Sequence, residues 1–353
     1  MILGVAHARA ALAQAWPPFV LVAGLLLIGR LAGEDGLFEA SASRLERLPG
    51  GSLAAFWSCL GLVALVTALL NLDTAAVFLT PVLIAVARRR RLAESPFLYG
   101  SVFMANASSL YLPGSNLTNL LVLSAHRPSG GAFLLEMLPA ALAASVVTAG
   151  GLAVIHRGAL RPAARVPREP AVPVRAGAGL LGAGAAAALM LALANPALPV
   201  LALALALVGW RAHRGGPPLR AELRSLGVPA LAGLFVLAVA LGIAARSGAI
   251  PLGWLHRAGA PAATGVAALA SVAINNLPAA VLMSSTGGLD HQALLIGLNV
   301  GPNLAVTGSL AVLLWWRAAR AAGARPSAAA YSRQGLALAP AAMLGALLAA
   351  GLL

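Results

Sequence analysis

The sequence predicts an all-α protein that crosses a lipid bilayer several times and is built from two related halves. Of its 353 residues, 60% are hydrophobic and 10% are charged, and the mean hydropathy is +0.89. This composition leaves too little polar surface to cover a soluble domain of this length, so lipid must solvate much of the chain. Each half also carries a short polar interruption of an apolar stretch, Asn71 to Thr74 in the first and Asn275-Asn276 in the second, which indicates a duplication.

The basic residues predict the orientation of the chain in the membrane. The formal net charge is +14, every basic residue is Arg, and 17 of the 24 lie in four segments that alternate with apolar stretches. A basic chain can bind nucleic acid, but these segments are not interleaved with aromatic residues, so we exclude a nucleic-acid partner. The positive-inside rule predicts a multi-pass protein of the cell inner membrane with these segments as cytoplasmic loops. The segments are 88–91, 157–175, 211–224 and 317–333.

Apolar length predicts the individual elements. Residues 34–50 mix acidic, Arg and apolar positions at helical spacing, which is typical of an interfacial amphipathic helix. Residues 157–175 contain four prolines and are expected to form a linker between a first repeat (1–156), short at its N-terminal end, and a second repeat (176–353). The predicted spans are 17–33, 98–125, 132–155, 177–195, 196–210, 226–246, 291–316 and 334–353.

Two segments are better explained as re-entrant hairpins than as spans. In 53–87 the arm after the polar interruption has only about a dozen residues, and in 262–287 both arms are short, whereas a spanning helix needs about 20. Counting crossings places the mouths of the two hairpins on opposite faces, which predicts an inverted repeat. Two further segments, 98–125 and 291–316, carry Gly114-Ser115 and Gly308-Ser309 and are expected to be broken transmembrane helices.

Broken helices at membrane depth predict the functional site. An unpaired backbone group in hydrocarbon is costly, so such breaks persist only inside protein or beside a wet cavity, and paired breaks are typical of secondary transporters. The alternative is that these Asn, Ser and Thr residues only bridge helices within the bundle. The predicted substrate-binding residues are Asn71, Asp73, Thr74, Ser115, Asn116, Asn275, Asn276, Asn299, Thr307, Gly308 and Ser309.

Asp73 is the predicted proton-coupling residue, because an acidic side chain between apolar arms is costly and functional by default. It could equally cap the helix that follows it, and the two roles are compatible. The lone cysteine, Cys59, is expected to be a core residue. At membrane depth the sequence shows no set of metal ligands and no nucleophile paired with a base, so we expect no metal, no cofactor and no intramembrane enzyme. A scaffold protein would not need polar breaks in both halves.

Five runs of the sequence resemble the arsenite efflux pump family, within the ion transporter superfamily that also holds citrate carriers. The similarity covers nearly all of residues 20 to 353, although the family carries an Asp and a Lys where this chain has Asn299 and Asn303. The runs are Gly33-Glu34-Asp35-Gly36-Leu37-Phe38, Leu79-Thr80-Pro81, Ser115-Asn116-Leu117-Thr118-Asn119, Asn275-Asn276-Leu277-Pro278 and Gly308-Ser309-Leu310-Ala311-Val312-Leu313-Leu314-Trp315.

The resemblance implies export of arsenite or antimonite by alternating access, driven by proton exchange or by association with a soluble ATPase subunit. Arsenite is an uncharged trihydroxide near neutral pH, so a pocket of amides and hydroxyls suits it. The alternative within transport is a carrier for citrate or a related carboxylate, with sodium as a second candidate for the coupling ion.

Overall fold

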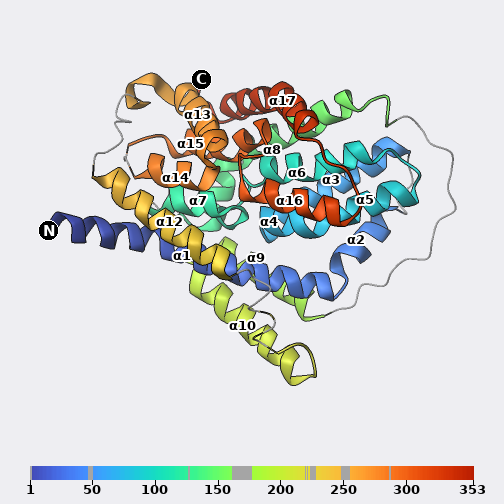
Figure 1. The fold of residues 1–353 in the computed structure, drawn as a ribbon, viewed down its shortest axis with the longest axis horizontal. Coiled ribbons are helices and arrows are strands. Elements are labelled where there is room, and N and C mark those ends of the chain that lie inside the picture. Colours follow the sequence, from blue (N-terminus) through green and yellow to red (C-terminus); the bar gives the residue numbers. More distant parts are fainter. Residues whose placement is uncertain are drawn as a thin grey trace.

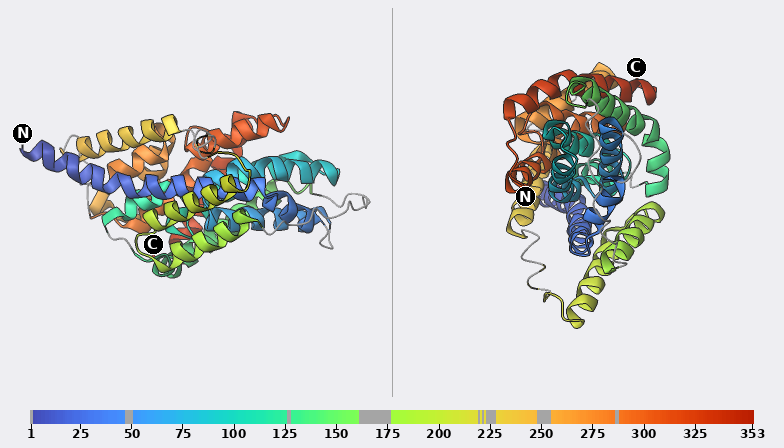
Figure 2. Two further views of the ribbon diagram at one scale, coloured as in Figure 1. Left: turned by 90° about the horizontal axis from the view of Figure 1, so that it is seen from below. Right: turned by 90° about the vertical axis from the view of Figure 1, so that its right-hand side faces the viewer.

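The computed structural model shows an elongated bundle in which every described regular element is a helix (Figure 1). It describes residues 2–46, 51–125, 128–160, 177–218, 220, 222, 228–247, 255–285 and 288–353. Most helices run along the long axis of the bundle, and Figure 2 shows α10 on its outside. The predicted all-α, polytopic fold class is therefore confirmed.

The first half contains one long helix, an amphipathic helix, a hairpin, a broken helix and a second long helix, in that order. The elements are α1 (Ile2–Glu34), α2 (Leu37–Glu46), α3 (Ser52–Leu69), α4 (Leu72–Thr74), the π-helical η1 (Ala75–Leu79), α5 (Thr80–Arg89), α6 (Glu94–Ser108), η2 (Pro113–Ser115), α7 (Leu117–Val122), η3 (Leu123–Ala125) and α8 (Gly130–Ile155).

The second half repeats the order of a hairpin, a broken helix and a long helix after three apolar helices. The elements are α9 (Ala178–Ala192), α10 (Ala197–His213), α12 (Val228–Arg246), α13 (Leu255–Ile274), α14 (Asn276–Ser284), α15 (His291–Val300), η4 (Gly301–Leu304), α16 (Leu310–Ala321) and α17 (Ala328–Ala349).

Four described helices are long and apolar enough to cross a membrane. They lie at Gly4–Glu34, Ser52–Leu69, Gly130–Ile155 and Arg257–Ile274, and three shorter apolar helices lie at Ala178–Ala192, Ala197–His213 and Leu231–Arg246. Several large apolar side chains on these helices are exposed, Leu135 at 75% and Leu181 at 70% among them. Lipid is the solvent that such surfaces require.

α1 packs against α9, α10 and α12. Small residues allow the backbones to approach closely. A Cβ on Gly24 would lie 3.0 Å from the backbone nitrogen of Leu201 in α10, and a Cβ on Gly179 would lie 2.3 Å from the backbone of Ala32. Close packing of this kind is a main source of helix association in lipid, where hydrophobic burial gives little driving force.

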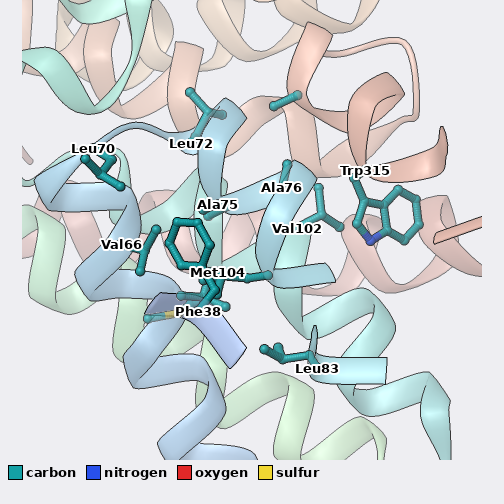
Figure 3. Close-up of a cluster of buried hydrophobic side chains, with 14 of the residues drawn as sticks. Phe38, Val66, Leu70, Leu72, Ala75, Ala76, Leu83, Val102, Met104 and Trp315 are labelled. Carbon is teal, nitrogen blue, oxygen red and sulfur yellow. The ribbon is translucent and has the colours of Figure 1, made fainter. Parts of the chain in front are cut away.

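The two halves meet around the first hairpin, α3 to α5. Figure 3 shows apolar side chains of both arms packed with Val102 and Met104 of α6 and with Trp315 of α16. The Trp315 indole is fully buried and donates a hydrogen bond to the Leu98 carbonyl at 2.9 Å. The second arm of the first hairpin therefore packs against α16 of the second half, and Trp315 links α16 to α6.

The two hairpins enter the bundle from opposite ends (Figure 1). Contacts with α1 define the direction, because Thr74 at the tip of the first hairpin faces Gly29 and Phe78, one turn further, faces Gly33. In the N-terminal half of α1, Gln14 donates a hydrogen bond to Ser284 at the mouth of the second hairpin, at 2.9 Å. Gln14 and Gly29 are separated by about 22 Å at 1.5 Å per residue. This arrangement is the one predicted for an inverted repeat, although the symmetry relation itself stays a prediction.

Two predicted boundaries are wrong. The first span starts near Ile2 instead of residue 17, and α1 continues through Pro17 and Pro18 because its first turns pack on α12. The second arm of the first hairpin, α4 to α5, has 18 residues instead of about a dozen, because the helix restarts directly after Asn71. In the second hairpin, α13 as a whole is long enough to span, but it is kinked at Gly259 (φ 78°, ψ 173°), three residues before the predicted start of the arm at residue 262.

The Arg-rich segments that the structure describes are mostly helix ends instead of loops. Arg88 lies in the last turn of α5 and donates a hydrogen bond to the Ala322 carbonyl at 2.7 Å, which joins segments 88–91 and 317–333. Arg211 lies in the last turn of α10 and pairs with Glu34 at 2.9 Å. Most of the predicted linker 157–175 lies outside the described residues.

The packing of α9 on α1 gives a first prediction. Gly179→Ala should lower the free energy of unfolding by about 1–3 kcal/mol, because the new methyl group would overlap the α1 backbone at Ala32. Thermal unfolding of the detergent-solubilised protein measures the change. Gly184→Ala is the matched control, since no atom lies within 4 Å of its Cβ position, and it should leave stability equal or slightly higher. Equal melting temperatures for both variants would contradict the packing.

Candidate functional site

Each of the four helix interruptions restarts on a side-chain cap. The first free N–H groups of a helix need acceptors, and Asn and Ser are preferred acceptors at that position. In all four cases the side-chain oxygen accepts a hydrogen bond from a backbone N–H two or three residues later. The pairs are Asn71 with Thr74 (2.6 Å), Asn116 with Thr118 (3.0 Å), Asn275 with Leu277 (3.4 Å) and Ser309 with Val312 (3.3 Å).

The tip of the first hairpin consists of an extended residue, Asn71, followed at once by helix. Asn71 has φ −176° and ψ 171°, and its side chain caps α4. Asp73 is therefore not the cap, because it lies inside the first turn, where a carboxylate stabilises the helix dipole. The Asp73 side chain is half-buried and makes neither a hydrogen bond nor an ion pair within the described part of the chain.

Three buried polar atoms near this tip have no partner among the described residues. They are Asn71 Nδ2, Thr74 Oγ1 and Thr67 Oγ1, and the three residues are at most 1% exposed. Buried polar groups are nearly always hydrogen-bonded, so three together require an explanation. Thr67 was missed by sequence reasoning; the available signal was a hydroxyl one helical turn before the interruption.

The tip of the second hairpin is held to the break between α15 and α16. Asn275 adopts φ +75°, a left-handed conformation that is costly outside glycine and that the surrounding structure must stabilise. The Asn276 N–H donates to the Gly308 carbonyl at 2.9 Å, and Asn275 Nδ2 donates to the Thr307 carbonyl at 3.3 Å. Thr307 Oγ1 in turn donates to the Val272 carbonyl at 2.9 Å. For the Asn276 amide side chain, the described residues provide no hydrogen-bond partner.

The contact between the second hairpin and this break requires glycine at position 308, because a side chain would not fit there. A Cβ on Gly308 would lie 2.4 Å from the Cα of Pro302, so no larger residue fits without moving the break. The same glycine offers its carbonyl to the second hairpin. Gly308 was predicted to belong to the site, and the close approach of its backbone to Pro302 explains why glycine occurs there.

A network of buried amides joins the two crossing breaks. Both polar atoms of the Asn299 side chain are fully hydrogen-bonded. Its Nδ2 donates to Asn119 Oδ1 (2.7 Å) and to the Leu295 carbonyl (2.8 Å). Its Oδ1 accepts from Asn116 Nδ2 (2.7 Å) and from Ser109 Oγ. A second link runs from Asn106 Nδ2 to Asn303 Oδ1 at 2.8 Å. Asn299 therefore connects the repeats and has no polar atom left for a ligand.

The remaining contacts bring all four interruptions together. Ser115 Oγ donates to the Ala68 carbonyl in the first hairpin at 3.2 Å. α4 packs against α16, which begins directly after Ser309, and α14 packs against α7, which begins directly after Asn116. All eleven predicted residues therefore belong to interruptions that converge within the bundle.

The chemistry available at this centre is neutral except for one group. Amides, hydroxyls and backbone groups provide donors and acceptors, and Asp73 is the only one of the ten acidic residues that lies between apolar arms at a break. Among the residues that the structure describes, no group of three or more His, Cys, Asp or Glu side chains could hold a metal ion. Such an arrangement can bind a small polar solute and can carry one proton.

Three comparisons with known proteins bear on the family and the fold of the chain. The family model described as Citrate transporter (CitMHS) matches residues 1–287. The chain is 28% identical over 338 residues to the arsenical pump membrane protein of Yersinia enterocolitica and 26% identical over 333 residues to that of Escherichia coli. Both alignments cover 85% of this chain and 78% of the relative.

The fold is similar to that of a solved transporter. The structure of the YdaH transporter of Alcanivorax borkumensis, reported to have an unusual topology, superposes with a TM-score of 0.62 at 13% sequence identity, covering 98% of this chain and 86% of that one. At this identity the similarity concerns the fold alone. The predicted resemblance to the ion transporter superfamily is confirmed.

The amide network gives a second prediction. Asn299→Ala should lower the free energy of unfolding by about 2 kcal/mol or more, because it leaves the buried Asn116 Nδ2 and Asn119 Oδ1 without a partner, at about 1–3 kcal/mol each. Thermal unfolding in detergent measures the effect. Asn195→Ala, at an exposed position between α9 and α10, is the control and should change little. A loss of transport at unchanged stability would instead place Asn299 in the ligand site.

Proposed function

The chain belongs to the citrate transporter family, and from that premise we propose that this membrane transporter is a proton-coupled secondary carrier that exports arsenite or antimonite by alternating access. The observation that carries the proposal is the neutral polar centre with a single acidic residue. Most of the predicted site residues cap or bridge the breaks there, and Asp73 is the one group that can exchange a proton. The proposed orientation has the Arg-rich helix ends in the cytoplasm and the protein in the inner membrane.

The character of the centre supports an uncharged substrate. Arsenite and antimonite are trihydroxides near neutral pH, and their hydroxyl groups both donate and accept hydrogen bonds. Amide and hydroxyl side chains match that pattern without a compensating charge, whose burial would be costly. The similarity to two arsenical pump membrane proteins supports the same choice.

Proton coupling is proposed to operate through Asp73. A carboxylate at membrane depth without an ion-pair partner is a functional candidate by default, and proton relays in transporters use such groups. In the proposed cycle, protonation of Asp73 favours release of the substrate on the outer side, and deprotonation on the cytoplasmic side favours rebinding. The proton-bound carrier and the substrate-bound carrier then stabilise different conformations, and coupled transport requires such a difference.

A second candidate is a carrier for citrate or a related carboxylate, with sodium as an alternative coupling ion. The description of the matching family model favours it. Against it, no Arg or His lies at any of the four interruptions, so only helix N-termini would offset the charge of a tricarboxylate.

Uptake into everted membrane vesicles tests both candidates and gives a third prediction. Vesicles containing this chain should accumulate arsenite when a pH gradient, acid inside, is imposed, and excess citrate should not compete. Asp73→Asn should abolish the response to the gradient, because the amide cannot exchange the proton. Glu94→Gln is the matched control, since Glu94 pairs with Arg88 at a helix end, and it should leave coupling intact.

Two results would contradict the proposal. Citrate uptake without arsenite uptake would favour the carboxylate carrier. Gradient-dependent arsenite uptake by Asp73→Asn, equal to that of the wild type, would remove Asp73 from the mechanism.

The second hairpin gives a fourth prediction. Cells expressing the wild type should accumulate less arsenite than cells expressing Asn275→Ala, because the variant loses both the cap of α14 and the link to Thr307. Accumulation of radiolabelled or mass-detected arsenic measures the difference, at matched membrane levels of the two proteins. Equal accumulation would remove the Asn275 side chain from the transport cycle.

A further inference from the structure

We propose that the chain binds one phospholipid with an anionic headgroup, its phosphate at Arg246 and one acyl chain in an apolar cavity between α1, the first crossing break and the turn from α9 to α10. None of the eleven predicted substrate-binding residues is among the described residues that line this cavity. The inference goes beyond the proposed function and requires only that the chain lies in a bilayer.

The cavity is apolar and open at the surface. It has a volume of about 560 Å³, and its described lining contains neither an acidic nor a basic side chain. Leu193 and Ala194, at the turn after α9, are exposed at its mouth, whereas Leu21 and Met190 are buried in its wall. Lipid tails are as apolar as such a lining and surround the helices, so an acyl chain is the occupant available there.

The floor of the cavity is the first crossing break. Pro113 and Gly114 line it, and a Cβ on Gly114 would lie 2.3 Å from Met190 Sδ. Along α1 the lining extends from Gln14 to Leu21, which is about 10 Å at 1.5 Å per residue. An acyl chain that enters at the Gln14 end therefore lies against the backbone of the break.

The Gln14 end of the cavity lies at the depth of a membrane interface. Glu34, near the other end of α1, pairs with Arg211 at 2.9 Å, and these charges mark one interface. Gln14 and Glu34 are separated by about 30 Å at 1.5 Å per residue, which is the thickness of the hydrocarbon layer. Trp16, 37% exposed beside Gln14, is a residue type enriched at interfaces. The phosphate layer of the other leaflet is therefore expected at the level of Gln14.

At this level Arg246 is a half-buried cation, and no described Asp or Glu forms an ion pair with it. Its Nη1 donates to the Gly242 carbonyl at 2.9 Å, and its Nη2 donates to Gln14 Oε1 at 2.7 Å. Gln14 is held in turn, because its Nε2 donates to the Leu121 carbonyl at 3.1 Å and to Ser284 Oγ at 2.9 Å. A guanidinium carries five N–H donors in a planar fork that matches phosphate. Gln14 therefore holds a phosphate-binding group at the end of the cavity that it also lines.

The two features together define the class of ligand. A free anion would use Arg246 and leave the cavity empty, and a neutral hydrocarbon would use the cavity and leave the cation unpaired. A lipid with a phosphate headgroup satisfies both. A net negative headgroup is preferred to a zwitterionic one, because the ammonium group of phosphatidylethanolamine would meet the guanidinium as a like charge.

Native mass spectrometry of the detergent-solubilised protein tests the site, which is the fifth prediction. In an equal mixture of phosphatidylglycerol and phosphatidylethanolamine with the same acyl chains, the wild type should retain one phosphatidylglycerol in preference. Arg246→Gln should reduce that preference by about tenfold or more, the scale of a lost charge-assisted hydrogen bond. Ala194→Phe, which places a ring at the mouth of the cavity, should lower the retention of both lipids. Melting temperatures measured without lipid check that each variant is folded.

Arg333→Gln and Ala192→Phe are the matched controls. Arg333 is an exposed residue of α17 that bonds to the Ala329 carbonyl, and Ala192 is an exposed residue of α9 outside the cavity lining. Both variants should retain phosphatidylglycerol as the wild type does.

Three results would overturn the site. An equal loss of preference in Arg333→Gln and Arg246→Gln would reduce the effect to net charge. Unchanged retention by Ala194→Phe, or release of the lipid by inorganic phosphate alone, would show that no acyl chain is seated in the cavity. Lipid retention is measured without a transported substrate, so each outcome is independent of arsenite transport.

Discussion

The structure depends on how four interruptions of helical hydrogen bonding are satisfied inside an apolar bundle. Each break frees backbone N–H and C=O groups that lipid cannot pair. At each break a side-chain oxygen caps the helix that restarts there. The capping residues are Asn71, Asn116, Asn275 and Ser309. These caps act within each break. Other freed carbonyls are paired between breaks, as the Gly308 carbonyl is with the Asn276 N–H and the Ala68 carbonyl is with Ser115 Oγ, and this pairing requires the interruptions to meet. A polar centre within a membrane protein is then a direct result of keeping the backbone hydrogen-bonded.

The centre has a rigid part and an incomplete part. Asn299 is fully hydrogen-bonded and links both crossing breaks, and the Asn106–Asn303 bond adds a second link. Fully paired buried networks of this kind fix one geometry, whereas partly paired ones are costly. The two crossing breaks are therefore expected to move as one unit. Where the resembled family has an Asp and a Lys, these two positions here are neutral, so the unit is held together without an ion pair whose desolvation would be costly.

The sequence predicted the breaks well and the side-chain roles poorly, and the reason is physical. Polar residues next to Gly or Pro in apolar stretches have few explanations in lipid, so Asn71, Asn275 and Gly308 could be placed to within a residue or two. Whether an Asn oxygen caps a helix or faces a ligand depends on the local backbone, which is why Asp73 was a candidate cap and Asn71 proved to be the cap. Thr67 was missed because only packing reveals that a hydroxyl in an apolar helix lacks a partner. Helix lengths were misjudged where tertiary contacts extend a helix past Pro17 and Pro18.

Related halves do not make the two hairpins equivalent in chemistry. When the polar interruptions are aligned on Asn71 and Asn275, Leu277 lies opposite Asp73 and Pro278 lies opposite Thr74. In the proposed alternating-access cycle, the hairpins exchange which one is free and which is bound to a crossing break, because hydrogen bonds that can open attach each of them. It cannot give the second hairpin a carboxylate or a hydroxyl at these positions. On this proposal the two hairpins act as two gates, while the carboxylate that carries the proton stays with the first hairpin in either conformation.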